Sequence, residues 1–479
     1  MTMEKKNYRQ TKLTCYFTNV VMSSVFSLPP LLFATFREMY GISYTLLGSL
    51  ILINFCTQLG VDLIFSFFSR YFNIHKTIRL MPLITAGGLF VYALFPMLFP
   101  RHAYLGIVLG TFIFSAAAGL GEVLISPAIA ALPSDTPDKD MSFLHSLYGY
   151  GLVGVVVVST LFLRFVGKEY WMYLTFFWAA LPVVASVLLM KSPLPDMDMG
   201  QSGKGSADSS KQRTRGLLLC MLCIFFGACA ENTMSNWISV YAEKALQIPK
   251  VWGDILGMSL FAILLALTRS AYAKFGKNIF KVLTVSMCGA AACYVAVAFS
   301  PNAALSLLAC VALGICTAML WPGTLILMEE KMPAAGVAAY ALMAAGGDFG
   351  ASVAPQMMGI VVDNISLTEW AESLGNALSL TPEQVGFKAG MLVAAVFPVF
   401  GVLLLAYMKK FFKEKIPLLR PDRGSPKGRS RGRCMRPEES PYGRSPMPPS
   451  RVRVSPVRYL KSGEASWTQT RPISSSESP

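Results

Sequence analysis

Glu122 is a carboxylate in the middle of a long apolar stretch, residues 103–132, which predicts a helix able to cross a bilayer core of about 30 Å. Glu122 is roughly ten residues from one end, so a rise of about 1.5 Å per residue places its carboxylate about 15 Å deep. An ionised side chain there is costly unless it meets a cavity, a partner or a proton. Its helix face also carries three small or polar residues at helical spacing: Ser115, Gly119 and Ser126. This face is therefore predicted to meet water, solute or protein rather than lipid.

Three further carboxylates stand among polar residues, mostly at helical spacing, in other apolar stretches: Asn54, Gln58, Asp62 and Ser66; Glu231, Asn232, Ser235, Asn236 and Ser239; and Asp348, Ser352 and Gln356. Amides and hydroxyls give directed hydrogen bonds, while tryptophans offer flat apolar surface. This mixture suits a neutral, hydroxyl-rich ligand such as a sugar. We predict that the substrate contacts Glu122, Glu231, Asn232, Asn236, Trp237, Trp321, Asp348 and Gln356. Arg164 and Arg269 are expected near the ends of their spans, so no cation is predicted at mid-depth and an anionic substrate is disfavoured.

Glu122 is also the residue expected to carry a proton. Removal from water favours the protonated form of a carboxylate, so Glu122 can bind and release a proton as a cavity opens to each side. Tyr150 is expected at similar depth, where it can hydrogen-bond Glu122, and His145 on the same predicted helix is a second proton-coupling candidate. Asp62 is the candidate for binding a cation such as sodium.

Structural roles compete with these functional ones. A polar ladder on a membrane helix can serve only to hold helices together. Asp62, close to one end of its span, can pair with cations of the adjoining loop, and His145 can be a helix contact. Cys220 and Cys223 form a CxxC pair on an apolar helix, where we expect packing. Phosphate-binding loops, nucleophile elbows and metal-ligand clusters do not occur in the sequence, so we predict no enzyme, no cofactor and no metal site.

The composition is that of a multi-pass membrane protein. The 479 residues are 54% hydrophobic and only 14% charged, whereas soluble domains are nearer 25% charged. The mean hydropathy is +0.50. We expect no cleavable signal, because Lys5, Lys6 and Arg9 lead into a full-length span. The net charge of +15 owes much to the tail beyond Lys415, which holds about 13 of the 42 Lys and Arg residues.

Hydropathy predicts an all-α membrane protein with twelve transmembrane helices. The expected spans are 13–36, 44–68, 77–99, 103–132, 141–166, 170–190, 216–241, 251–275, 280–299, 303–328, 335–365 and 388–412. A polar stretch between the last two spans, 366–387, predicts a short surface helix. Lys and Arg are roughly three times as frequent on the side of the N-terminus, so both termini are predicted in the cytoplasm and the protein in the inner or plasma membrane.

Matching motifs predict that the spans form two six-helix repeats. Gly119 and Glu122, followed by Ser-Pro, correspond to Gly314 and Thr317, followed by Trp-Pro, at an offset of about 195 residues. Gly149-Tyr-Gly in the fifth span corresponds to Asp348-Phe-Gly in the eleventh at nearly the same offset. Matches in corresponding spans indicate a duplicated unit.

The expected domain organisation follows from these spans. Residues 1–190 form an N-terminal six-helix bundle, 191–215 a polar cytoplasmic linker, and 216–412 a C-terminal six-helix bundle. Residues 413–479 are rich in Pro, Ser, Gly and Arg, which predicts a disordered basic cytoplasmic tail.

The sequence resembles the major facilitator superfamily. The stretch 69–76 resembles that superfamily's basic loop after the second span, and 274–277 resembles its second copy. Gly-Leu-Gly-Glu122 with Ser126-Pro127 is similar to the fucose-permease-like branch of sugar:proton symporters, as are Glu231 with Trp237 and Gly-Gly-Asp348-Phe-Gly. The resemblance covers about residues 10–412 and implies sugar recognition and proton coupling at Glu122. The aspartate that the branch carries in its first span is absent, since Ser27-Leu-Pro-Pro30 occupies that region.

These observations predict a monomeric, proton-coupled importer of a small neutral polar solute that works by alternating access. Its expected partners are the solute, membrane lipids and a proton or sodium ion, with no nucleic acid. Three alternatives stay open: an exporter of amphipathic compounds, a sodium-coupled symporter and a membrane sensor that does not transport.

Overall fold

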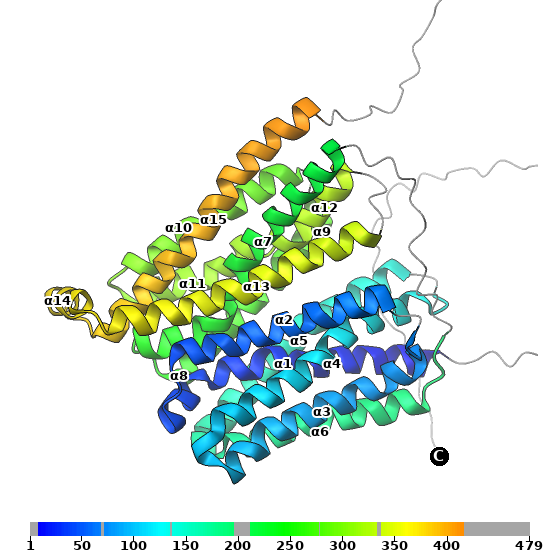
Figure 1. The fold of residues 1–479 in the computed structure, drawn as a ribbon, viewed down its shortest axis with the longest axis horizontal. Coiled ribbons are helices and arrows are strands. Elements are labelled where there is room, and N and C mark those ends of the chain that lie inside the picture. Colours follow the sequence, from blue (N-terminus) through cyan, green and yellow to red (C-terminus); the bar gives the residue numbers. More distant parts are fainter. Residues whose placement is uncertain are drawn as a thin grey trace, which may run out of the picture. The chain divides into compact units, whose positions relative to one another are not determined.

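The computed structural model describes residues 8–68, 71–134, 137–195, 211–276, 278–332 and 337–415, and these residues are almost entirely helical (Figure 1). The helices of the first helix group are α1 (Arg9–Tyr40), α2 (Tyr44–Phe68), α3 (Ile74–Leu98), α4 (Ala103–Ala130), α5 (Pro137–Phe165) and α6 (Trp171–Lys191). Those of the second helix group are α7 (Lys211–Val240), α8 (Lys250–Trp252), α9 (Leu260–Phe275), α10 (Ile279–Phe299), α11 (Ala303–Thr317), α12 (Leu320–Lys331), α13 (Val337–Ser366), α14 (Glu369–Leu378) and α15 (Pro382–Lys415).

Ten helices of the described residues are long and apolar enough to cross a membrane. They are Arg9–Tyr40, Tyr44–Phe65, Ile74–Leu98, Pro100–Ile129, Lys168–Lys191, Gln212–Ala245, Lys250–Tyr272, Ile279–Phe299, Ala303–Lys331 and Pro382–Lys413. The fifth and eleventh predicted spans fall on α5 and α13. Among the described residues, α5 contributes only the shorter apolar helix Gly149–Phe165, and α13 carries the polar ladder of Asp348. Twelve spans and the two-fold repeat therefore stay predictions.

The eighth and tenth predicted spans depart from regular α-helix in their interiors. The eighth span is built from α8, a π-helical segment over Gly253–Ser259 and α9. The tenth span is interrupted between Thr317 and Leu320, so that α11 and α12 are separate helices. The short surface helix predicted over 366–387 is confirmed as α14.

Local sequence explains where several helices begin and end. Side chains of Asn73, Asn278, Asn302 and Thr368 accept a hydrogen bond from the backbone N–H three residues further on, which caps the helix that follows. Gly41 ends α1 in the left-handed conformation, with φ 66°, and its N–H donates to the Arg37 carbonyl. Within each helix the backbone polar groups bond to one another, which lets an apolar segment enter hydrocarbon.

The first helix group is held together by close backbone contacts and a buried tryptophan. A methyl group placed on Gly88 of α3 would lie 2.5 Å from the Phe114 nitrogen of α4, so only glycine allows this approach. Trp171, at the start of α6, is fully buried and packs edge-on against Phe36 of α1 with ring centroids 4.8 Å apart. These contacts join α1, α3, α4 and α6.

The second helix group repeats this use of glycine. A methyl group on Gly350 of α13 would lie 2.4 Å from the Phe225 carbonyl oxygen of α7, and one on Gly346 would lie 2.6 Å from Met221. On α15, one on Gly401 would lie 2.6 Å from Met287 of α10. The α7–α13 pair and the α10–α15 pair therefore pack with their backbones close together.

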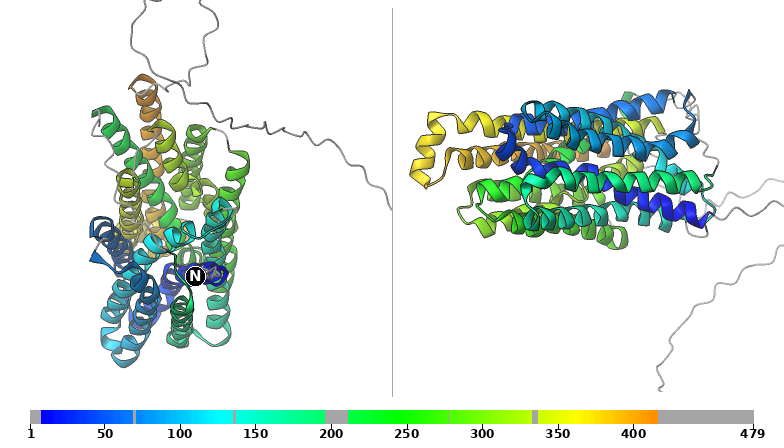
Figure 2. Two further views of the ribbon diagram at one scale, coloured as in Figure 1. Left: turned by 90° about the vertical axis from the view of Figure 1, so that its right-hand side faces the viewer. Right: turned by 90° about the horizontal axis from the view of Figure 1, so that it is seen from below.

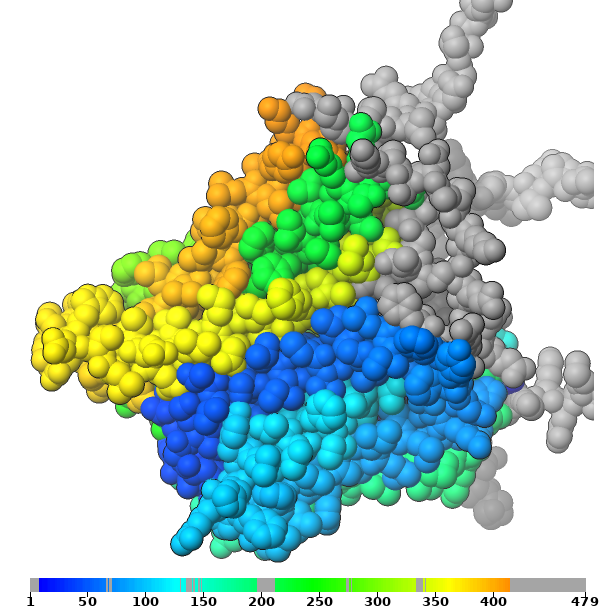
Figure 3. Space-filling view, in the orientation of Figure 1, coloured from blue at the N-terminus to red at the C-terminus, as the bar shows by residue number. Residues whose placement is uncertain are grey.

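The two groups meet where α2 lies alongside α13 (Figure 3). A methyl group on Gly48 would lie 3.1 Å from the Pro355 carbonyl oxygen, and one on Gly359 would lie 2.2 Å from the Tyr44 carbonyl oxygen. We call this contact the α2–α13 seam. Figure 2 shows the same helices from two further sides.

Charged and aromatic residues close one end of this contact, which we call the paired end and define by Glu38, Tyr44, Lys244, Asp363 and Glu383. The Glu38 carboxylate pairs with Lys244 of the second group, and the Tyr44 hydroxyl donates to Glu383 at 2.7 Å. The Arg37 guanidinium lies 3.9 Å from the centroid of the Tyr44 ring and donates to Glu383 at 3.2 Å. The hydrogen bonds and ion pairs described between the two groups all lie at or beside this end.

Candidate functional site

The polar residues of α2 and α4 lie side by side in a fixed register. Ser115 Oγ donates to Asn54 Oδ1 at 2.6 Å, and Gln58 Nε2 donates to the same oxygen at 3.1 Å. One turn further along α4, a methyl group on Gly119 would lie 3.2 Å from the Gln58 Cα. The two helices therefore run in the same direction with matched spacing, and this register brings Asp62 of α2 next to Glu122 of α4.

Three carboxylates from three helices lie within electrostatic reach of one another. The Glu122 charge acts on Asp62, and the charges of Glu122 and Asp62 both act on Asp348 of α13. Asp348 is 7% exposed, whereas Glu122 is exposed and Asp62 is half-buried. We call Asp62, Glu122 and Asp348 the carboxylate cluster. It draws residues from both helix groups.

The carboxylate cluster lacks compensating partners in the part of the chain that the structure describes. No hydrogen bond or ion pair joins the carboxylate of Glu122 or Asp348 to a described residue, and the buried Oδ1 of Asp62 has no hydrogen-bond partner there. The pairing of Asp62 with a Lys or Arg of the adjoining loop, which the sequence analysis considered, is therefore not seen among the described residues. Ser66 and the side chain of His145, both named by the sequence analysis, lie outside the described side chains.

Glu231 differs from the cluster because it already has a cationic partner. Arg269 of α9 donates through Nη2 to both Glu231 oxygens, at 2.9 and 3.1 Å. The sequence analysis did not predict this ion pair, because spacing within one segment does not show which neighbouring helix Arg269 faces. The position of Arg269 near the end of its span stays a prediction.

Several side chains predicted to contact the substrate instead form hydrogen bonds within the protein in this conformation. Asn232 and Asn236 donate their side-chain amides to carbonyls of their own helix, at 3.1 and 2.8 Å. Trp237 is fully buried and donates to the Pro355 carbonyl at 3.0 Å. Gln356 donates to the Thr45 carbonyl at 3.2 Å across the α2–α13 seam, and its Oε1 is buried without a partner among described groups.

Trp237 belongs to an aromatic cluster that joins the two groups. Its ring packs edge-on against Phe33 of α1 and Tyr44 of α2, with centroids 5.6 and 5.9 Å apart. Phe387 of α15 packs against Tyr44 at 4.9 Å. The indole predicted to face the substrate thus forms part of the closure between the groups in this conformation.

The side chains of Trp321 and Tyr150 are at least partly exposed. Trp321 is half-buried, and a methyl group on Gly347 would lie 2.2 Å from its ring, which places the indole beside the residue preceding Asp348. Tyr150 is 67% exposed, and the hydrogen bond expected between its hydroxyl and Glu122 is not formed. A Cβ on the neighbouring Gly149 would lie 3.6 Å from Ala266 of α9, so α5 approaches the second group there.

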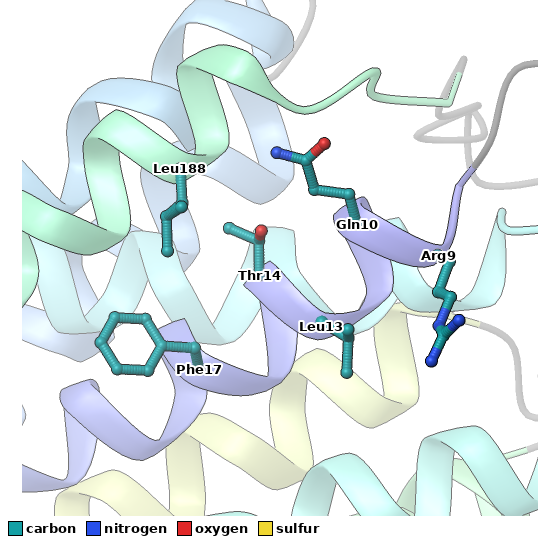
Figure 4. A pocket seen from close by; sticks show the side chains of 6 residues that line it. All are labelled: Arg9, Gln10, Leu13, Thr14, Phe17 and Leu188. Atoms are coloured by element: carbon teal, nitrogen blue, oxygen red, sulfur yellow. The ribbon is translucent and has the colours of Figure 1, made fainter.

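A separate groove of about 460 Å³ lies between α1 and α6, away from the carboxylate cluster (Figure 4). Its lining is mainly apolar and comprises Arg9, Gln10, Leu13, Thr14, Phe17 and Leu188. No group of three His, Cys, Asp or Glu side chains within the described ranges is arranged to hold a metal ion. The carboxylate cluster is therefore the candidate functional site.

Three solved structures with similar folds are distant from this chain in sequence. A bacterial homolog to the human lysosomal transporter Spinster is 14% identical, with a TM-score of 0.64, covering 88% of this chain and 100% of that one. A D-xylose-proton symporter is also 14% identical, with a TM-score of 0.65, covering 82% of this chain and 97% of that one. The nucleoside transporter NupG is 16% identical, with a TM-score of 0.60, covering 85% of this chain and 99% of that one.

A search of curated proteins finds no match to this chain. The family comparison does, and it covers residues 13–355, which is more than half of the sequence and includes all of the first helix group except its first residues. The solved structures agree with it in fold. The chain belongs to the major facilitator superfamily and is a multi-pass membrane transporter.

Proposed function

We propose that this protein is a secondary active transporter that imports a small neutral polar solute, such as a sugar, together with protons. The observation that carries the proposal is the carboxylate cluster, which draws Asp62, Glu122 and Asp348 from both helix groups without a described cation. Several like charges close together in an apolar site are unfavourable, and proton uptake relieves them. Protonation is then coupled to the arrangement of the two groups, because Asp348 belongs to the group opposite the other two.

The polar groups around the cluster support a neutral substrate. Glu231 and Arg269 neutralise each other, so this pair leaves no free cation to attract an anion. Solute hydroxyls can bond to protonated or ionised carboxyls and to the amides of Asn232 and Asn236, once these leave their own helix. The similar D-xylose-proton symporter agrees with this reading, although its likeness extends to the fold alone.

Alternating access gives the paired end a role in the cycle. Because the paired end is closed, we infer that the site opens toward the end where α1 and α7 begin, which we place in the cytoplasm. The resemblance to the fucose-permease-like branch supports sugar recognition and proton coupling at Glu122. The proposed conformation is thus the one that releases an imported solute.

Glu122→Gln tests the proposal because glutamine keeps the shape of a protonated carboxyl but cannot release a proton. The solute is first identified by thermal-shift screening of purified protein against neutral sugars and nucleosides, and then assayed in proteoliposomes. We expect the variant to exchange that solute by counterflow but to lose accumulation driven by a proton gradient. Glu330→Gln, at an exposed carboxylate at the end of α12, is the matched control and should retain both activities. Full proton-driven accumulation in Glu122→Gln excludes the proposal.

A sodium-coupled symporter is the second candidate, because the register of α2 and α4 places Asp62 beside Glu122. Two adjacent carboxylates can supply oxygen ligands to a sodium ion. Replacing sodium with choline in the same proteoliposomes decides between the ions, since uptake by a proton-coupled protein is unchanged. Uptake confined to inside-out vesicles would instead indicate an exporter, and thermal stabilisation without counterflow would indicate a sensor.

A further inference from the structure

The tenth span is interrupted beside the carboxylate cluster, and the sequence explains the interruption. Pro322 has no backbone N–H, so the Ala318 carbonyl four residues earlier loses its helical donor. Helix α11 accordingly ends at Thr317, and α12 begins at Leu320. A carbonyl left open within a membrane-spanning segment needs a donor from elsewhere.

Arg269 supplies that donor from another helix. Its Nε donates to the Ala318 carbonyl at 2.9 Å, and its Nη2 donates to both carboxylate oxygens of Glu231. Glu231 lies on α7 and Arg269 on α9, so a single guanidinium ties the interruption to two other helices. Only an arginine has separate donors fixed in one plane for a carbonyl and a carboxylate, and the single ammonium of a lysine does not reproduce them.

The residues just after the interruption are packed against the site. A methyl group on Gly227 of α7 would lie 2.7 Å from the Leu320 Cβ, and one on Gly347 would lie 2.2 Å from the ring of Trp321. Gly347 directly precedes Asp348. Any rotation of α12 about the interruption therefore changes the position of the Trp321 indole relative to Asp348.

We propose that Arg269 is a positioning residue that fixes the α11–α12 interruption and thereby holds Trp321 against Gly347, beside Asp348. The inference rests on the proposed function only in treating Asp348 and Trp321 as part of the solute site. Through Glu231 and the Ala318 carbonyl, Arg269 makes the interruption a rigid joint rather than a free hinge. Arg269 itself does not need to contact the solute.

Fluorine NMR of protein containing fluorinated tryptophan tests this proposal without solute or a proton gradient. The chain has seven tryptophans, and Trp321→Phe identifies the resonance of Trp321 by its loss. We expect Arg269→Lys to shift and broaden the Trp321 resonance while the other resonances keep their positions. Arg164→Lys, on α5, is the matched control and should change none of them.

Pro322→Ala in the Arg269→Lys background provides the rescue. Alanine restores the missing N–H, so the Ala318 carbonyl regains a donor within the helix and the Trp321 resonance should narrow again. Glu231→Gln removes the other anchor of the guanidinium and should reproduce the effect of Arg269→Lys. An unchanged Trp321 resonance in Arg269→Lys overturns the proposal. So does a shift of all seven resonances in both Arg269→Lys and Glu231→Gln, which would make the arginine a general stabiliser.

The proposed function is tested by different measurements, so the two can fail separately. If Glu122→Gln retains proton-driven accumulation while Arg269→Lys moves only the Trp321 resonance, the coupling assignment fails and the positioning role stands. In transport assays with the solute found by thermal shift, a positioning role predicts a higher KM for Arg269→Lys, with restoration by Pro322→Ala. An unchanged KM in Arg269→Lys would show that the joint does not serve the solute site.

Discussion

The carboxylate of Asp363, near the end of α13, accepts a hydrogen bond from the backbone N–H of Tyr44, the first residue of α2, at 3.1 Å. Its other oxygen accepts from the N–H of Thr45 at 2.6 Å. The first N–H groups of a helix have no partner within the helix, and a negative charge near them is favourable. Asp363 thus caps a helix of the opposite group, and this cap is lost whenever the groups separate at the paired end.

Asp363→Asn should therefore weaken closure of the paired end. A charged acceptor for a backbone N–H contributes about 1.5–3 kcal/mol, so its loss should raise the open population about tenfold or more. The measurement is maleimide labelling of Ile42→Cys, a position 3% exposed in this structure, in a version without the native cysteines. Asn364→Ala changes the neighbouring exposed residue and serves as the control. The prediction is contradicted if Ile42→Cys is labelled at the same rate in the parent protein and in the Asp363→Asn variant.

Glu38 pairs with Lys168 of its own group and with Lys244 of the other, so Glu38→Gln should also favour opening. Partly exposed pairs contribute about 0.2–1 kcal/mol, so labelling of Ile42→Cys should rise by no more than about fivefold. High salt screens such pairs and should remove most of the difference between Glu38→Gln and the parent. Glu169→Gln, at an exposed carboxylate without a described ion pair, should have no effect. A rise that persists at high salt would mean that Glu38 acts through packing instead.

Gly359→Ala should destabilise the closed arrangement, because the added methyl group would lie 2.2 Å from the Tyr44 carbonyl oxygen. Overpacking of this kind costs about 1–3 kcal/mol and can be relieved only by moving α13 away from α2. The matched control is Gly60→Ala on α2, where a methyl group meets nothing within 4 Å. We expect a lower Tm or faster labelling of Ile42→Cys for Gly359→Ala alone. The same Tm and labelling rate for both variants would show that α2 and α13 are not in contact in the membrane.

Asp348→Asn should weaken solute binding while leaving the fold intact. Asp348 makes no hydrogen bond or ion pair within the described residues, so its replacement breaks no contact that holds helices together. A hydrogen bond to a charged acceptor contributes about 1.5–3 kcal/mol, which corresponds to an affinity loss of roughly 10- to 100-fold. Thermal-shift titration with the solute from the sugar and nucleoside panel gives both affinity and Tm. A lowered Tm with unchanged affinity would make Asp348 a structural contact.

The sequence predicts those features that depend on one segment at a time. Apolar runs locate the helices, and spacing along one helix identifies the faces of Glu122 and Asp348. Partners on other helices are not visible in this way, because nothing in one segment shows its neighbours. The pairing of Arg269 with Glu231 was missed for this reason. The cap formed by Asp363 was missed as well, although a carboxylate near the end of an apolar span is a signal for an interaction at the membrane boundary.

The α2–α13 seam also bears on how the protein responds to temperature. Because Gly48 and Gly359 bring two backbones into contact, opening the seam is expected to expose apolar surface that is buried in this structure. Newly wetted apolar surface raises the heat capacity, so the balance between the closed and open forms will curve with temperature. Burial of apolar surface weakens on cooling, so we expect lower temperature to shift the balance toward the form open at the paired end.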